Sequence, residues 1–221
     1  MTLASRRLCL VVAGVYFAWL VSPLLDPQLH PWTSYASEYF VADRPAASVL
    51  RTADGLSGML LVVIAVLSYA RVRTLWRGRA AVRTWAGALA VAGAATVVDA
   101  INPMTCAPSV SPACAAAEAA GTLPVQHHLH TGSSALVGIA FVVAMLASLV
   151  LSTREDRVVR IASWAGIVTT ALSGIDALFT RIPTEGITQR ISMVTIVVWL
   201  VAAAGLPVVE RLRADPRPVA A

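Results

Sequence analysis

Six stretches of about twenty mostly apolar residues follow one another along this chain, separated by shorter polar segments. A helix of about twenty residues is long enough to cross a hydrocarbon layer of about 30 Å. Of the 221 residues, 57% are hydrophobic and only 13% are charged, and the mean hydropathy is +0.73. A soluble domain carries about 25% charged residues. We therefore expect an all-α, polytopic membrane protein, built as a bundle of six transmembrane helices.

The apolar stretches set the approximate limits of the predicted helices. They cover residues 8–25, 54–72, 84–102, 127–151, 158–179 and 187–209. Longer polar segments follow the first and third helices, and the second of these, 103–126, is expected to be a loop that contains two cysteines. Residues 1–213 are interpreted as one domain, and the proline-containing tail 214–221 is expected to be disordered.

The arginines predict the orientation of the bundle. All 17 basic residues are arginine, and 13 of them lie in the two terminal segments and in the loops after the second and fourth helices. The other side holds only Arg44, Arg51, Arg181 and Arg190. The positive-inside rule then puts both termini in the cytoplasm of a multi-pass plasma (inner) membrane protein. The same clustering between apolar blocks argues against a nucleic-acid partner, despite the net charge of +5.

Two of the three cysteines lie in the loop 103–126, on the side predicted to face outward. That side is oxidising, so we expect Cys106 and Cys114 to form a disulfide. The alternatives are a free pair or a zinc site, and oxidation competes with the latter. Cys9 lies in the first helix and is expected to be a small buried apolar residue.

Histidines gather where the fourth predicted helix begins. His127 and His130 are three residues apart and therefore share a helix face, a spacing that suits zinc or a similar ion. Two histidines need a further ligand. Asp99, Asp176, Glu38 and Asp54 lie at similar depth, and Asp99, near the outer end of the third helix, is the ligand in the metal hypothesis. Carboxylates inside transmembrane helices are costly and often mark function. The alternative is a structural role for Asp99, with Asn102 as its partner one turn away.

Other outward residues complete a hypothetical catalytic site. Glu38 and Asp176 are candidate general bases. Arg51, Arg181 and Arg190 are candidates for binding a phosphate head group, because arginine suits bidentate phosphate recognition. Structural alternatives exist here too: Arg181 is a possible ion-pair partner of Asp176, and an acid such as Asp54 at a helix start complements the helix dipole.

Two further motifs do not support a function. The sequence Gly55-Leu-Ser-Gly58 matches the GxSG pattern of rhomboid proteases, but no histidine follows on the sixth helix to activate the serine. Its glycines are better explained as small residues that allow close helix contact. A haem site is disfavoured because all four histidines lie in outer segments, three of them within four residues.

Several local motifs together resemble the domain-of-unknown-function 998 family. They are Ser37-Glu-Tyr-Phe40 with Arg51 and Asp54–Gly58, the block from Asp99 through Cys106 and Cys114 to His130, and Gly186–Ile191 ahead of Trp199. The resemblance covers nearly the whole chain and implies six spans, but no activity. The family is similar in architecture to eukaryotic proteins of the Frag1, DRAM and Sfk1 type, which are associated with lipid-anchor remodelling and membrane lipid organisation. By analogy, this makes membrane lipid the expected substrate or partner.

Three functions compete. The first is a metal-assisted lipid hydrolase or acyl transferase at the outer leaflet, with zinc lowering the pKa of a bound water. The second is a non-enzymatic lipid-binding or scaffold protein. The third, a small transporter, is weakest, because no ionisable residue lies near the middle of a predicted span.

Overall fold

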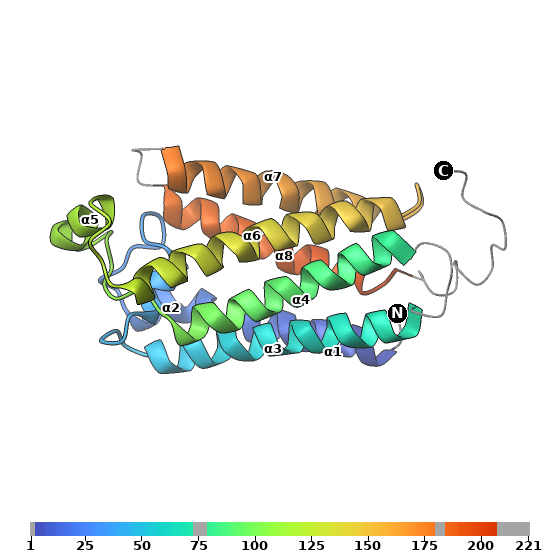
Figure 1. Cartoon of the computed structure of the whole chain (residues 1–221), viewed down its shortest axis with the longest axis horizontal. Helices are drawn as coiled ribbons and strands as arrows, with labels where there is room; N and C mark the ends of the chain where they lie inside the picture. The colour runs from blue at the N-terminus through green and yellow to red at the C-terminus, as the bar shows by residue number, and fades with distance from the viewer. Residues whose placement is uncertain (1–2, 73–78, 180–183, 207–221) are drawn as a thin grey trace.

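The computed structural model describes residues 3–72, 79–179 and 184–206, and the regular structure in these ranges is helical throughout. Six helical segments are long and apolar enough to cross a membrane, as the sequence predicts (Figure 1). The first is α1 (Leu3–Tyr16), continued by the 3-10 helix η1 (Phe17–Val21) and the short α2 (Ser22–Leu25). The others are α3 (Ala47–Val72), α4 (Arg79–Ile101), α6 (Val125–Leu151), α7 (Arg157–Phe179) and α8 (Glu185–Ala203). The prediction of a disordered tail, 214–221, lies outside the described residues.

The first span changes to a 3-10 helix over Phe17–Val21, shortly before Pro23. Pro23 has no N–H to donate to the carbonyl of Trp19, four residues earlier. The Ser22 backbone N–H and hydroxyl both donate to that carbonyl instead, the hydroxyl at 2.6 Å. The tighter turn buries the Trp19 side chain between the helices.

Helix α3 begins at Ala47 rather than at the predicted Asp54. The loop before it ends at Ala46, which has a positive φ of 61°. The polar Arg51 and Thr52 look like loop residues in the sequence, yet Thr52 Oγ1 donates to the carbonyl of Ser48 within the helix at 2.7 Å. Asp54 therefore lies inside α3, and a dipole role at a helix start does not apply to it.

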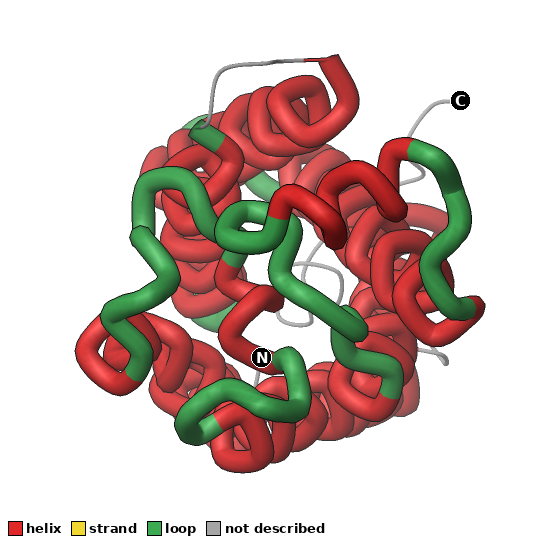
Figure 2. Tube along the Cα trace, turned by 90° about the vertical axis from the view of Figure 1, so that its left-hand side faces the viewer, coloured by secondary structure: helices red, strands yellow, loops and turns green. Residues whose placement is uncertain are grey.

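The six spans form a ring in which neighbours along the chain are neighbours in space. The order around the ring is α1, α3, α4, α6, α7 and α8, and α8 also contacts α1, which closes the ring. The end-on view in Figure 2 shows this arrangement. The first described residue of α1 and the last of α8 lie at the same end of the bundle (Figure 1).

Alanines and glycines bring the helices close together. Gly58 of α3 and Gly93 of α4 face each other so closely that a Cβ on Gly58 would lie 2.6 Å from the Gly93 carbonyl oxygen. Ser57 is buried beside them and donates to the carbonyl of Ala53 at 2.9 Å. This confirms that the glycines of the Gly55–Gly58 motif serve close helix contact.

Two polar segments fold over the end of the bundle opposite the termini, and we call them the cap (residues 26–46 and 102–124; Figure 2). The segment 26–46 contains the 3-10 helix η2 (Ala36–Phe40), and 102–124 contains the short helix α5 (Pro112–Ala119). The predicted disulfide between Cys106 and Cys114 is present, with Cα atoms 6.1 Å apart. A small apolar cluster joins the two segments to α3; it comprises Leu29, Tyr39, Phe40, Val41, Leu50, Met104 and Ala107.

The cap is also fixed to the start of α8. The backbone N–H of Ile187 donates to the Trp32 carbonyl at 3.1 Å, and that of Ala36 donates to Gln189 Oε1 at 2.7 Å. Gly186 is required here, because a Cβ would lie 2.6 Å from the Ser34 carbonyl oxygen. The cap therefore connects three segments that are far apart in the sequence.

Candidate functional site

Asp99 and His130 meet between α4 and α6, one turn from the cap end of each helix. His130 Nδ1 lies 3.2 Å from Asp99 Oδ1, the distance of an ion pair, although the angle is not that of a hydrogen bond. The His130 side chain is only 3% exposed, and neither of its ring nitrogens has a hydrogen-bond partner in the described part of the chain. A buried imidazole whose Nε2 has no partner there is available to exchange a proton with a ligand.

Two serines hold the Asp99 carboxylate in place. Ser133 Oγ donates to Oδ1 at 2.5 Å and Ser134 Oγ donates to Oδ2 at 2.7 Å. Both follow His130 by about one helical turn on α6, so α6 supplies the imidazole and the two hydroxyls that position its partner. The geometry fixes the carboxylate beside the imidazole, where it can stabilise an imidazolium.

Further polar side chains approach this pair from α3 and α1. Asp54 on α3 lies within electrostatic range of Asp99, and Tyr16 on α1 lies within range of both acids. The helices are in direct contact at this level, since a Cβ on Gly55 would touch the Ala100 Cβ at 3.4 Å. Polar groups from four neighbouring spans therefore gather at one depth.

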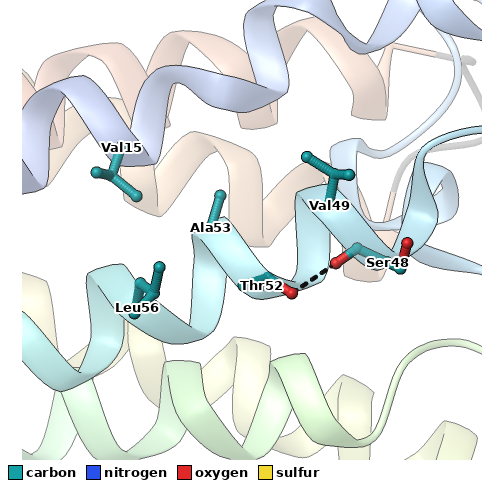
Figure 3. A pocket seen from close by; sticks show the side chains of 6 residues that line it. All are labelled: Val15, Ser48, Val49, Thr52, Ala53 and Leu56. Atoms are coloured by element: carbon teal, nitrogen blue, oxygen red, sulfur yellow. Dashed lines mark hydrogen bonds between the residues drawn. The ribbon is translucent and has the colours of Figure 1, made fainter.

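A mostly apolar groove of about 390 Å³ opens between α1 and α3 beside these residues (Figure 3). Its lining residues are Val15, Ser48, Val49, Thr52, Ala53 and Leu56. Tyr16 directly follows one lining residue, and Asp54 lies between two others. The groove lies on helices that cross the membrane, so its surroundings are lipid.

His127 is buried in a different set of contacts. The backbone N–H of Thr105 donates to Nδ1 at 3.2 Å, so that nitrogen carries no proton. The other nitrogen, Nε2, then donates to Glu118 Oε1 at 3.3 Å. Both nitrogens of His127 are therefore used to hold the disulfide-containing segment against α6, and a metal ion would have to displace one of these bonds.

The zinc hypothesis needs His127, His130 and Asp99 to converge. Within the described ranges, no three histidine, cysteine, aspartate or glutamate side chains are grouped as a metal site requires. The structure brings His130 and Asp99 together and directs His127 toward Thr105 and Glu118. Zinc binding at these residues stays a prediction.

Glu38, a candidate base, is buried inside the cap. Its Oε1 accepts from the Tyr35 backbone N–H at 3.0 Å, and its Oε2 accepts from the Ser109 backbone N–H at 3.2 Å and hydroxyl at 2.5 Å. Burial raises the pKa of this carboxyl above its usual range, and the hydrogen bonds from Ser109 and Tyr35 offset part of the rise. Glu38 therefore joins the two cap segments, at a place separate from the Asp99–His130 pair.

Asp176, the other candidate base, joins α7 to α8. Its carboxylate accepts from the hydroxyls of Thr184, at 3.0 and 3.1 Å, and Thr188, at 2.7 Å. The role of Asp176 as a base stays a prediction.

The three candidate head-group arginines have different places. Arg51 Nε donates to the Ala100 carbonyl at 2.9 Å, which links α3 to α4. Arg190 is buried under the cap. Arg181 lies outside the described residues.

Sequence reasoning did not identify the residues that complete these contacts. Ser133 and Ser134 follow His130 by three and four residues, so helical spacing alone could have suggested them. Thr105 and Glu118 meet His127 only because the disulfide segment folds back, and no sequence pattern indicates that fold.

The fold and the site together define an integral membrane protein of six spans with a folded cap and a buried carboxylate–histidine pair. The chain belongs to the family described as proteins of unknown function, DUF998, whose model matches residues 9–206. This confirms the resemblance in the sequence. No curated protein and no solved structure matches the chain.

Proposed function

We propose that this protein acts on membrane lipid at the outer leaflet, as a hydrolase or acyl transferase in which His130 is the general base. The observation that carries the proposal is a buried imidazole whose Nε2 has no partner among the described residues, placed 3.2 Å from a carboxylate that two serines hold. A polar group buried in a membrane protein without a partner is costly, and such residues often mark function.

The orientation is part of the proposal. With 13 of 17 arginines in the terminal segments and in the loops on their side, the positive-inside rule puts the cap outside the cytoplasm and both termini inside. The plasma (inner) membrane is the proposed location. The Cys106–Cys114 disulfide agrees with an oxidising side for the cap.

The groove between α1 and α3 suits one chain of a bilayer lipid. Its volume of about 390 Å³ and its apolar lining fit an acyl chain, and it opens toward surrounding lipid. A chain lying there would bring the ester to the helix turns that carry Tyr16 and Asp54, and both of these side chains lie within electrostatic range of Asp99.

The proposed step is ester cleavage. His130 Nε2 takes a proton from a water molecule, whose oxygen forms a bond to the ester carbonyl carbon. The bond from that carbon to the alcohol oxygen then breaks, and the imidazolium returns its proton to the leaving oxygen. Asp99 stabilises the imidazolium between the two transfers. In acyl transfer, an alcohol takes the place of the water.

The test is turnover by the purified protein in nanodiscs, measured as fatty acid and lysolipid release by mass spectrometry. We expect His130→Ala to lose at least about a hundredfold in rate, the usual worth of a general base. Asp99→Asn should lose rate as well. His128→Ala is the matched control, since His128 is exposed on the same helix turn and should leave the rate unchanged.

Two results would contradict the proposal. One is wild-type turnover that survives in His130→Ala. The other is the absence of turnover with lipid still bound equally by both proteins, which would favour a non-enzymatic lipid-binding or scaffold protein. Elemental analysis of the wild type beside His127→Ala/His130→Ala tests the zinc prediction in the same preparations.

A further inference from the structure

A second polar feature lies under the cap and does not belong to the Asp99–His130 pair. Arg190, on the second turn of α8, is 7% exposed and forms no ion pair with any residue in the described ranges. A buried charge without a counterion is strongly unfavourable unless something else compensates it. The question is what compensates the guanidinium.

One nitrogen of the guanidinium is fully used. Nη1 donates to the carbonyls of Pro31, Ser34 and Gly186 at 2.9, 2.7 and 2.9 Å. These bonds fix the plane of the group against the cap. The two remaining nitrogens, Nε and Nη2, are buried and have no hydrogen-bond partner among the residues that the structure describes. They form one edge of the guanidinium, which is the edge that meets two oxygens of a single oxyanion.

A second unpartnered donor belongs to a ring that lies near the guanidinium. The indole nitrogen of Trp19 is buried and makes no hydrogen bond to the described chain, and the Trp19 ring centroid lies 6.0 Å from Arg190 Cζ. On another side, the ring of Tyr39 lies 5.7 Å from the same carbon, and its hydroxyl donates to the Leu29 carbonyl at 2.7 Å. The unpartnered groups are thus donors only, and all three nitrogens are buried.

The Glu38 carboxyl lies within electrostatic range of Arg190, but it forms no ion pair with the guanidinium. Glu38 uses both oxygens to accept from Tyr35 and Ser109, and Asp26 forms an ion pair with Arg44 at 3.3 Å. Within the described ranges, Arg190 therefore has no ion-pair partner, and its Nε and Nη2 have no acceptors.

We propose that the Nε–Nη2 edge of Arg190, together with the Trp19 indole N–H, binds a phosphate-type oxyanion under the cap. Such a group supplies both an ion-pair partner in direct contact and the missing acceptors. Its source is either the head group of a membrane phospholipid or free phosphate. Trp19 is followed by Leu20 and Leu24, which are exposed on the outside of the bundle, so lipid lies close to the site.

Two variants separate binding from folding. Arg190→Lys keeps a positive charge with three donors for the three carbonyls but removes the Nε–Nη2 edge. Trp19→Phe keeps the ring and removes only the indole N–H. Arg154→Lys and Trp164→Phe are the matched controls, since both side chains are exposed and neither belongs to the cap, α1 or α8.

The experiment has two arms, both on the full-length protein. The first counts phospholipid retained after delipidation of phosphatidylglycerol nanodiscs, by native mass spectrometry. The second follows the thermal unfolding of delipidated protein as inorganic phosphate is added. We expect the wild type to retain one phospholipid, if a head group is the ligand, or to be stabilised by phosphate, if the free ion is.

In whichever arm binding is found, Arg190→Lys should abolish it and Trp19→Phe should weaken it about tenfold, the worth of one charge-assisted hydrogen bond. The controls should bind as the wild type does. If both arms give the same result for the wild type and for these two variants, the site holds only water and the proposal is wrong. The readout is binding, so it is independent of whether His130 supports turnover.

Discussion

The buried polar residues near the cap differ in whether the protein itself satisfies them. His127, Glu38 and Asp176 each have protein partners on all the atoms that need them, so removing them would chiefly weaken the fold. His130 and Arg190 keep buried nitrogens without partners in the described ranges. Buried charged and histidine side chains therefore fall into two groups in this molecule, those with a structural role and those free to bind a ligand. Their hydrogen bonds, and not their residue types, distinguish the two groups.

Glu38 gives the cap a pH dependence that can be predicted in sign. Its pKa in the folded protein is raised by burial above the usual value of 4.5, so the folded state favours the protonated carboxyl. Its contribution to stability is fully present below 4.5 and is lost as the pH rises through the raised pKa. We expect the melting temperature of the detergent-solubilised protein to fall as the pH rises from 4.5 through the raised pKa of Glu38. The fall should be smaller in Glu38→Gln.

The control for this titration is Glu155→Gln, because Glu155 is exposed between α6 and α7. That variant should follow the wild-type curve at every pH. A Glu38→Gln curve parallel to the wild type would mean that another group causes the dependence.

At the scale of helices, the contact between α3 and α4 depends on two glycines. A Cβ on Gly58 would lie 2.6 Å from the Gly93 carbonyl and 3.0 Å from the backbone N of Val97, and backbone atoms cannot yield as a flexible side chain can. We expect Gly58→Ala to destabilise the protein by about 1–3 kcal/mol, the cost of overpacking. Thermal unfolding in detergent measures it.

Gly87 is the matched control, since it lies on α4 and a Cβ added there would meet no described atom within 4 Å. There, Gly87→Ala should be neutral or stabilising by up to about 1 kcal/mol, because alanine favours the helix. Equal losses for both variants would show that the contact between the helices is not the cause.

Some of these structural features can be predicted from the sequence, and others cannot. Apolar length predicts the six spans, and Asp99 and His130 can be placed near the same end because each lies close to the end of a predicted helix. The start of α3 is missed, since Arg51 and Thr52 are polar residues that a helix carries at the membrane surface. The contact between Trp19 and Arg190 joins the first span to the sixth. It cannot be predicted from the sequence, because it depends on which helices are neighbours in the bundle.

For the whole molecule, the orientation is the property to test first. On intact cells, we expect a membrane-impermeant maleimide to label Asp43→Cys, in the cap, and not Arg154→Cys, between α6 and α7. Both side chains are exposed. The background is Cys9→Ala, which removes the free cysteine and leaves the Cys106–Cys114 disulfide intact. Labelling of Arg154→Cys alone would reverse the proposed topology.

The ring order of the spans has a consequence for how the protein is made. Because each span packs against the one that precedes it in the chain, most of the bundle can form step by step as the spans leave the ribosome, with short-range contacts only. The exception is α8, which must find α1, the first of these six spans, and whose Gly186 and Arg190 contact the cap. During synthesis the bundle of these six spans therefore stays open along the seam between α1 and α8 until α8 is inserted.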